Sequence, residues 1–205
     1  MKKIWIIGLV VLAIILIVFF AFRFFSNNNQ VPLSQYEASR IAIDNTENNE
    51  NHPQEVKLGS FSTELLSEDK DRLTNIKITC SRINETVVKS GKEFSFCDVV
   101  GNPKSEDGYK KANAFGADGE IIQAIGGGNC QVSTTIYNAV LKVDGLKVTE
   151  RHEHDRDVAY IQDGKDATVA YDYLDLKFEN NNNFDIKLYA YVNDDKVTVE
   201  VFKVI

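Results

Sequence analysis

The sequence has few of the residues that build metal and nucleotide sites. It contains only three cysteines and three histidines, and neither type occurs in the Cys-x-x-Cys or His-x-x-x-His pairs typical of zinc sites. The glycines at 126–128 precede Asn129 and Cys130 rather than the Lys-Ser/Thr ending of a nucleotide-binding P-loop. Although His152, His154 and Cys130 together offer three ligands, their spacing does not favour zinc, and we expect neither metal nor cofactor.

Basic residues are scarce beyond the first part of the chain. The sequence has 23 Lys and Arg against 30 Asp and Glu, with a formal net charge of −7. Lys2, Lys3 and Arg23 lie in the first 23 residues, which contain no acid, so the remainder is more acidic still. Since such a surface repels phosphate backbones and other anionic polymers, we expect no nucleic-acid partner.

The N-terminal residues carry the pattern of a membrane segment. Residues 4–22 contain no charge, and a run of this length can cross a hydrocarbon core of ~30 Å as a helix. A cleaved signal peptide is the alternative, but its apolar region is usually shorter and ends in small residues, whereas this run ends among phenylalanines. Lys2 and Lys3 favour a cytoplasmic N-terminus, an argument that Arg23 on the far side weakens.

These features predict three parts. Residues 1–25 form a single-pass transmembrane anchor in the cell membrane, and residues 26–57 form a flexible polar linker rich in Asn and Glu. Residues 58–205 form one domain on the extracytoplasmic side. Its size suits a single hydrophobic core, and we find no internal repeat.

The pattern over residues 58–205 predicts an α+β domain, an antiparallel β-sheet with two main helices. Helices are expected at 70–83 and from 130 to about 144, where apolar residues recur with helical spacing. Turn-type residues predict hairpins at 118–119 and 193–195. Strands are expected around Phe94 and Phe96 and at 60–65, 86–88, 112–115, 120–124, 146–151, 167–171, 174–178, 185–192 and 196–204.

The glycine run that precedes Cys130 is the most distinctive stretch. It places Cys130 at the start of a predicted helix, where unpaired N–H groups and the helix dipole lower a thiol pKa and favour the thiolate. Backbone amides of the same loop are candidates for an oxyanion hole. The alternative is that Cys130 is a small buried hydrophobe.

A nucleophilic cysteine needs a base and a group that orients the base. On a strand, His152 and His154 would share one face, and either is a candidate base. The orienting group can come from any of four aspartates: Asp155, Asp157, Asp166 and Asp175. The alternative is a solvated charged loop at the end of a strand.

The odd cysteine count leaves at least one thiol unpaired in an oxidising compartment. Three pairings are open. Cys80 and Cys97 are 17 residues apart on elements that can pack together, so we favour a disulfide between them and a free Cys130.

Several motifs between Phe61 and Val204 occur together in a known order and spacing. They are Phe94-Ser95-Phe96, Val100-Gly101, Gly108-Tyr109, Gly126-Gly127-Gly128-Asn129-Cys130-Gln131-Val132-Ser133-Thr134-Thr135, Asn138-Ala139, Arg151 with His154, Asp166-Ala167-Thr168-Val169, and Asp175-Leu176-Lys177-Phe178-Glu179-Asn180. In these motifs the domain resembles the VanW-like family, which is named after a vancomycin-resistance gene cluster and is found in bacterial cell-envelope proteins. Some members are implicated as cysteine-dependent L,D-transpeptidases that form 3-3 cross-links in peptidoglycan.

The resemblance implies roles for individual residues. Cys130 occupies the nucleophile position, and His154 matches the family histidine, which His152 does not. Oxyanion or substrate-binding roles are implied for the neighbouring motif residues Gly127, Gly128, Asn129, Gln131, Ser133, Thr134 and Arg151. The chain departs from the family at Asn129, where a bulky apolar residue is usual. It also departs at Cys80 and Cys97, where the family commonly lacks cysteine, and their joint appearance strengthens the proposed pair.

The resulting functional prediction is a membrane-anchored cysteine L,D-transpeptidase that acts on the stem peptides of peptidoglycan through a Cys130 thioester. The alternative is a non-catalytic peptidoglycan-binding or scaffold module of the cell wall. That alternative predicts that Cys130 is buried and lies away from His154.

Overall fold

The computed structural model describes residues 54–116 and 119–205. The predicted transmembrane anchor and nearly all of the predicted linker lie outside these residues. Within the described ranges, no helix is long and apolar enough to cross a membrane. The first strand begins at Glu55, three residues before the predicted domain boundary, because its N-terminal residues still pair with the last strand of the chain.

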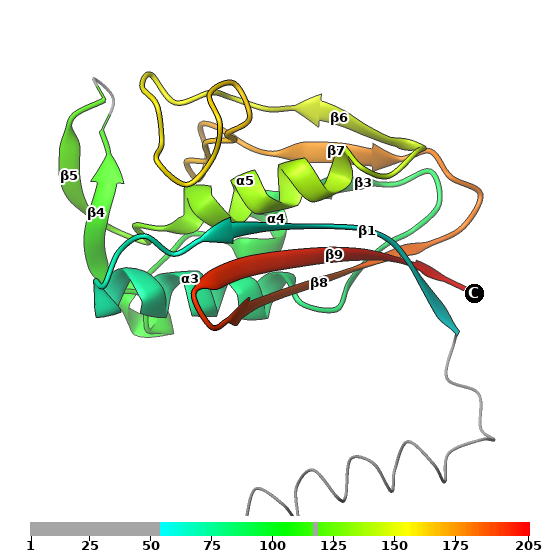
Figure 1. Cartoon of the computed structure of the whole chain (residues 1–205), viewed down its shortest axis with the longest axis horizontal. Coiled ribbons are helices and arrows are strands. Elements are labelled where there is room, and N and C mark those ends of the chain that lie inside the picture. Colours follow the sequence, from blue (N-terminus) through cyan, green and yellow to red (C-terminus); the bar gives the residue numbers. More distant parts are fainter. Residues whose placement is uncertain (1–53, 117–118) are drawn as a thin grey trace, which may run out of the picture. The chain divides into compact units, whose positions relative to one another are not determined.

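The described residues form a mixed α+β fold with antiparallel sheets and few helices, shown in Figure 1. In chain order the elements are β1 (Glu55–Glu64), α3 (Lys70–Ile83), β2 (Thr86–Val88), β3 (Glu93–Ser95), α4 (Phe96–Val100), the 3-10 helix η1 (Ser105–Asp107), β4 (Lys111–Phe115), β5 (Ile121–Ile125), α5 (Asn129–Val140), β6 (Leu146–Glu150), β7 (Lys177–Asn180), β8 (Ile186–Asn193) and β9 (Lys196–Val204).

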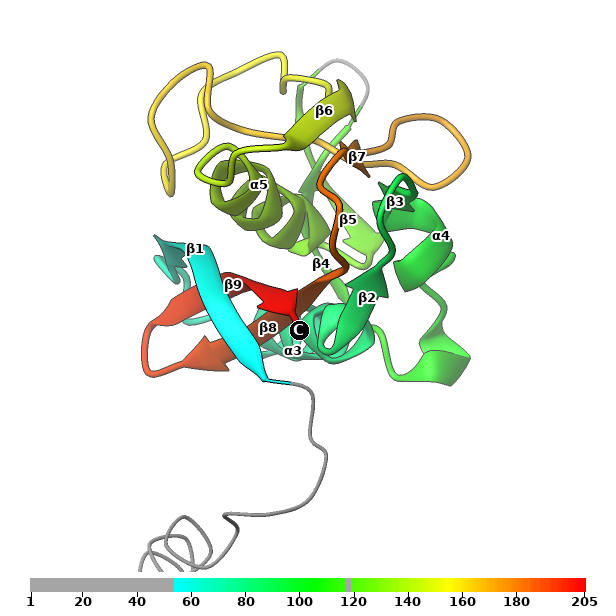
Figure 2. The ribbon, with the colours of Figure 1, turned by 90° about the vertical axis from the view of Figure 1, so that its right-hand side faces the viewer.

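The strands form three antiparallel sheets. Their orders are β1-β9-β8-β2, β3-β7-β6 and β4-β5. Helix α5 lies between the four-stranded and the three-stranded sheet, and α3 packs beside it against β8 (Figures 1 and 2). The β4–β5 hairpin stands at the N-terminal end of α5. This arrangement makes α5 the central element of the domain.

Helix α5 is buried on nearly every side. All its residues except Cys130 and Tyr137 are buried, since a sheet covers each of two opposite faces. Its apolar residues Val132, Ile136 and Ala139 are fully enclosed in the core. Its polar residues must then find partners inside the protein, and in the described residues no buried side-chain nitrogen or oxygen lacks one.

Elements with a strong local pattern are confirmed. Helix α3 has the predicted bounds, and Asp69 caps it by accepting the N–H groups of Asp71 and Arg72. The predicted hairpins are β4–β5 and β8–β9, which pair in register across their turns. Strands β2 and β6 also lie where the pattern placed them, and β1 covers the predicted strand at 60–65 but begins five residues earlier.

Four local predictions are wrong. Phe96 begins α4 rather than continuing a strand, because the Ser95 hydroxyl accepts the Asp98 N–H at 3.0 Å and caps a helix there. The helix that starts near Cys130 ends at Val140, not near residue 144. Residues 167–171 form only isolated bridges, and the strand expected at 174–178 is β7, shifted to Lys177–Asn180.

The predicted disulfide is not formed in the structure. Cys80 on α3 and Cys97 on α4 are both free thiols. Burial raises the pKa of each to about 12, and for Cys97 the charge of Asp175 adds to the effect. Both groups are therefore protonated thiols at neutral pH.

Candidate active site

A tight glycine loop positions Cys130 at the first turn of α5. A Cβ on Gly127 would lie 2.6 Å from the Ala112 carbonyl oxygen of β4, so only glycine allows this approach. Gly128 has a φ of +116°, and a Cβ there would also meet Ile76 of α3 at 2.9 Å. The loop therefore brings the N-terminus of α5 directly against β4 and α3.

Cys130, His154 and Asp166 form a connected triad. The His154 side chain interacts electrostatically with the Cys130 thiol. His154 Nδ1 lies 2.5 Å from Asp166 Oδ2, and the His154 backbone N–H donates to the same oxygen at 2.7 Å. Because Nδ1 faces the carboxylate, Nε2 is the ring nitrogen left for the thiol. A nucleophile, a base and an orienting acid are thus linked in the order that thiol catalysis requires.

The triad favours a charged pair of sulfur and imidazole. Burial would raise the pKa of Cys130, but the hydrogen bond and charge of His154 outweigh it and hold that pKa below the usual range. Burial would lower the pKa of His154, but Cys130 and then Asp166 raise it above its usual value. The pKa of Asp166 is lowered, since hydrogen bonds from His154 outweigh burial. The arrangement therefore stabilises a thiolate beside an imidazolium.

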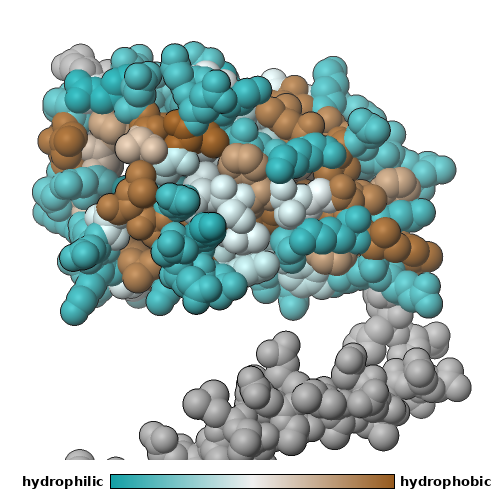
Figure 3. All heavy atoms as spheres, viewed as in Figure 1, coloured by the Kyte–Doolittle hydropathy of each residue, from teal (hydrophilic) through white to brown (hydrophobic). Residues whose placement is uncertain are grey.

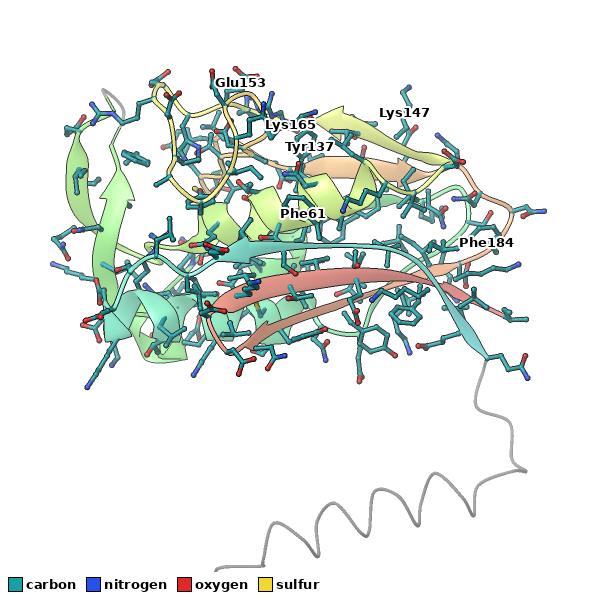
Figure 4. All side chains as sticks on the ribbon, in the orientation of Figure 1. Phe61, Tyr137, Lys147, Glu153, Lys165 and Phe184 are labelled. Atoms are coloured by element: carbon teal, nitrogen blue, oxygen red, sulfur yellow. The ribbon has the colours of Figure 1, made fainter. Side chains whose placement is uncertain are left out.

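Arg151 holds the Asp166 carboxylate from the other side. Its Nε donates to the Asp166 backbone oxygen at 2.6 Å, and its Nη2 donates to Asp166 Oδ1 at 3.1 Å. Arg151 also pairs with Glu153 and lies over the Tyr137 ring. Figure 4 shows Tyr137 on the side of α5 that faces the chain segment carrying Glu153 and Lys165. These contacts give Arg151 a positioning role rather than a free substrate-binding side chain.

Polar side chains of α5 hold the backbone around Asp166. Ser133 Oγ donates to the Ala167 oxygen at 2.6 Å, and Thr134 Oγ1 accepts the Ala167 N–H at 2.9 Å. Asn138 Nδ2 donates to the Lys165 oxygen at 2.7 Å. Ser133 and Thr134 are fully buried, so the structure places them under the triad, where they fix Asp166, rather than at a surface that a substrate reaches.

Two further motif side chains tie α5 to its neighbours. Asn129 Oδ1 accepts the Thr79 hydroxyl of α3 at 2.7 Å. Gln131 Nε2 donates to the Glu64 oxygen of β1 at 2.8 Å, and its Oε1 accepts Arg72 Nη2 at 3.1 Å. Both side chains are buried. Their contacts lead into the protein, so they position the helix that carries Cys130.

The loop amides divide into two groups. The N–H groups of Gly127, Asn129 and Gln131 donate to backbone oxygens of residues 124, 126 and 128 at 3.0–3.3 Å. Among the hydrogen bonds of the described ranges, the amides of Gly128 and Cys130 donate to none. These two amides are the ones available to an oxyanion next to the sulfur.

Comparison with known proteins places this geometry in a family. The family described as VanW like protein matches residues 71–202. The chain belongs to the VanW-like family. It is 38% identical over 139 residues to the uncharacterized protein YoaR of Bacillus subtilis (strain 168), over 68% of this chain and 45% of that protein. It is 26% identical over 140 residues to the vancomycin B-type resistance protein VanW of Enterococcus faecalis (strain ATCC 700802 / V583), over 65% of this chain and 50% of that one.

The match spans about half the length of these curated relatives. No solved structure matches the chain significantly.

The other candidate residues of this VanW-like domain lie outside the triad. His152 Nε2 pairs with Glu150 at 3.0 Å rather than with Cys130. Asp175 accepts the Ser95 hydroxyl at 2.6 Å and the Cys97 N–H at 2.9 Å. Asp155 and Asp157 are exposed on the loop that follows His154. Of the four candidate aspartates, Asp166 is the one whose carboxylate contacts His154.

The triad opens into a cleft of about 1270 Å³. The β4–β5 hairpin contributes an apolar wall, and Figure 3 shows exposed apolar side chains at this end of the molecule. Phe115 of this hairpin packs edge-on against the His154 ring, with 5.4 Å between centroids. Cys130 Sγ lies 3.5 Å from both Thr168 Oγ1 and the Val169 oxygen.

Sequence reasoning missed Phe115, Tyr160 and Arg72 as cleft residues. Tyr160 is neutral at ordinary pH, because burial and then the charge of Cys130 raise the pKa of its hydroxyl. These residues come from a hairpin, a loop and a helix that are distant in sequence. The sequence around each of these residues therefore does not indicate that they line one site. Over the described part of the chain, no group of three or more His, Cys, Asp or Glu is placed to hold a metal ion.

Proposed function

We propose that this VanW-like domain is a cysteine L,D-transpeptidase that forms 3-3 cross-links between peptidoglycan stem peptides. The observation that carries the proposal is the Cys130–His154–Asp166 triad, in which the pKa of the sulfur is lowered and the sulfur lines a cleft. A non-catalytic wall-binding module needs no such pair and predicts a thiol remote from His154, so the contact favours the enzyme.

The proposed reaction proceeds through a thioester. The Cys130 thiolate attacks the carbonyl between the L-centre of a diamino acid and the terminal D-residue, and the amides of Gly128 and Cys130 stabilise the oxyanion. As the tetrahedral species collapses, the C–N bond breaks, and imidazolium His154 gives its proton to the leaving amine. A second stem's amine then attacks the thioester, neutral His154 takes its proton, and the thiolate leaves. Asp166 keeps the imidazole oriented throughout.

We further propose that the domain acts outside the cytoplasm, anchored by the uncharged run at residues 4–22. This run lies outside the described residues. In fractionated cells, the full chain should sediment with the membrane and resist extraction by salt and alkali. A chain that starts at residue 26, directed outward by a cleavable signal, should be soluble. Membrane retention of the shortened chain would contradict the anchor.

The direct test supplies the detergent-solubilised full chain with tetrapeptide-bearing muropeptides and detects 3-3 dimers by mass spectrometry. Wild type should form dimers and a covalent acyl adduct on Cys130, and Cys130→Ala should form neither. Asp166→Asn should lower the rate by about 10²–10⁴-fold, because the imidazole loses its orienting charge. Asp155→Asn is the matched control, since this exposed acid lies next to His154 but outside the triad. The proposal fails if wild type forms no dimers, or if Cys130→Ala equals wild type.

A further inference from the structure

One wall of the cleft carries a cation that the triad does not use. Arg72 lies in the first turn of α3 and lines the cleft. Its stem crosses over the glycine loop, where a Cβ on Gly128 would be 3.3 Å from Arg72 Cγ. Its guanidinium donates to the Asn113 oxygen of β4 at 3.3 Å and to Gln131 Oε1 of α5 at 3.1 Å. The side chain is therefore held beside the first turn of the helix that presents Cys130.

Both acceptors of Arg72 are neutral. Among the described residues, no carboxylate forms an ion pair with its guanidinium, and Asp69 instead caps the α3 backbone. Arg151 differs, since Asp166 and Glu153 neutralise it. A guanidinium has five donors and matches a carboxylate in a bidentate geometry. Arg72 thus retains donors and an uncompensated charge on the wall of the cleft.

The side of the cleft opposite Arg72 carries charges of both signs. The loop after β6 contributes the acidic residues Glu153, Asp155 and Asp157 and the basic residues Arg151 and Arg156. Figures 1 and 2 place that loop and α3 on opposite sides of the N-terminal end of α5. Cys130 therefore lies between this loop and Arg72. Tyr160 lines the same cleft, and after burial, which raises the pKa of its hydroxyl most, the charge of Cys130 raises that pKa and the charge of Arg72 lowers it.

We propose that Arg72 is the specificity-determining residue that receives the α-carboxylate of the substrate's C-terminal residue, the one released when Cys130 is acylated. This inference rests on the proposed function for its substrate. A terminal residue carries a carboxylate on the carbon next to its amine, whereas a residue inside a peptide carries a neutral amide there. Arg72 would accordingly restrict the enzyme to the end of a stem peptide.

The first test uses two small alkylating reagents as probes, so it needs no transpeptidase substrate. Iodoacetate is anionic and iodoacetamide is its neutral analogue, and peptide mass spectrometry follows the rate of each at Cys130 in the full chain. The ratio of the iodoacetate to the iodoacetamide rate should fall about tenfold in Arg72→Gln, equal to about 1.4 kcal/mol. Arg72→Lys should retain part of the preference, because it keeps the charge.

Arg156→Gln is the matched control. Arg156 lines the same cleft from the loop side, over the Phe115 ring. Its substitution should leave the ratio unchanged. The iodoacetamide rate reports whether the thiolate and the fold are intact, so a misfolded variant changes both rates together. A ratio that is unchanged in Arg72→Gln, or that falls in Arg156→Gln instead, overturns the proposal.

The second test compares tetrapeptide stems that end in a free carboxylate or in a carboxamide, by the rate at which Cys130 is acylated. Wild type should prefer the acid, and Arg72→Gln should lose most of that preference. Equal acylation of the two stems by wild type would overturn the role of Arg72 while leaving the transpeptidase intact. If neither stem acylates Cys130 but the alkylation ratio still depends on Arg72, the carboxylate site stands and the proposed function fails.

Discussion

At the scale of single residues, a half-buried thiol is normally a poor nucleophile because burial disfavours its charged form. Cys97 shows this case, since its pKa is raised to about 12 with Asp175 as its charged neighbour. Cys130 is also only partly exposed, but it has His154 as its partner, and its pKa is lowered instead. The two thiols line the same cleft, so the partner accounts for the difference.

The first prediction follows from this difference. In wild type, alkylation of Cys130 by iodoacetamide should continue below the pH at which an ordinary thiol is protonated, while Cys80 and Cys97 react slowly. In His154→Ala, burial is opposed only by the weaker effects of Thr168 and Val169, so the pKa of Cys130 should rise and the rate profile should move to higher pH. The measurement is the pH dependence of alkylation at each cysteine by peptide mass spectrometry.

His152→Ala is the control for this prediction, because His152 pairs with Glu150 and not with the thiol. Its profile should follow wild type. An unchanged profile in His154→Ala would show that the imidazole does not set the state of the sulfur.

At the scale of elements, the helices and strands that were predicted correctly are those determined by a local sequence pattern. Helix α3 and the two hairpins follow from apolar periodicity and turn residues, and they have the expected places. The segment 167–171 was predicted as a strand because its residues favour one. The Ser133 hydroxyl donates to the Ala167 oxygen and the Thr134 hydroxyl accepts the Ala167 N–H, and these bonds hold the segment in an irregular path instead. The sequence of that segment alone cannot predict these contacts, because they come from α5, more than thirty residues earlier in the chain.

The candidate site was also predicted only in part from local sequence. The glycine run identified Cys130 as the candidate nucleophile, and the residues after β6 include His154 and the four candidate orienting acids. Choosing Asp166 among them needed the fold, because Arg151 and the polar face of α5 fix that carboxylate. From sequence alone, the polar residues of α5 were predicted to bind substrate. Because two sheets enclose the helix, Ser133, Thr134 and Asn138 instead form hydrogen bonds with the protein's own backbone.

The second prediction concerns the docking of α5 on β4. Gly127→Ala would place a Cβ 2.6 Å from the Ala112 oxygen and 2.7 Å from the Asn113 oxygen, and a backbone atom cannot rotate away as a side chain does. The free energy of unfolding should fall by about 1–3 kcal/mol or more, and Cys130 alkylation should slow as the first turn of α5 shifts. Denaturant unfolding measures the first effect.

Gly91→Ala is the control, since it has a φ of +68° and no neighbouring atom within 4 Å of an added Cβ. It should cost only the left-handed backbone strain of about 1–2 kcal/mol and leave alkylation of Cys130 unchanged. Equal effects at both positions on both measurements would contradict the close docking of the loop on β4.

At the scale of the whole molecule, the three-stranded sheet is joined to the cleft by a network of charges. Glu150 ends β6, where Oε2 lies 2.8 Å from Lys177 Nζ of β7 and Oε1 lies 3.0 Å from His152 Nε2. Glu150 Oε1 also accepts the Asp175 N–H at 3.0 Å. One carboxylate thus links β6 and β7 to His152, which lines the cleft, and to the backbone of Asp175.

The third prediction is a stability profile that depends on this carboxylate. Lys177 first, and then His152, lower the pKa of Glu150 from 4.5 to about 2. A depressed carboxyl pKa adds stability that is present above the unfolded value of 4.5 and is lost as pH falls through the folded value of about 2.

The urea concentration at the unfolding midpoint of wild type should therefore decrease as the pH is lowered from 4.5 to about 2. Glu150→Gln should lower the midpoint at neutral pH and flatten its decline in acid, as measured by urea unfolding from neutral pH to about pH 2. Glu106→Gln is the matched control, because Glu106 forms an exposed ion pair with Lys104, and its profile should parallel wild type. A Glu150→Gln profile as steep as that of wild type would mean that other carboxylates set the acid limit of the fold.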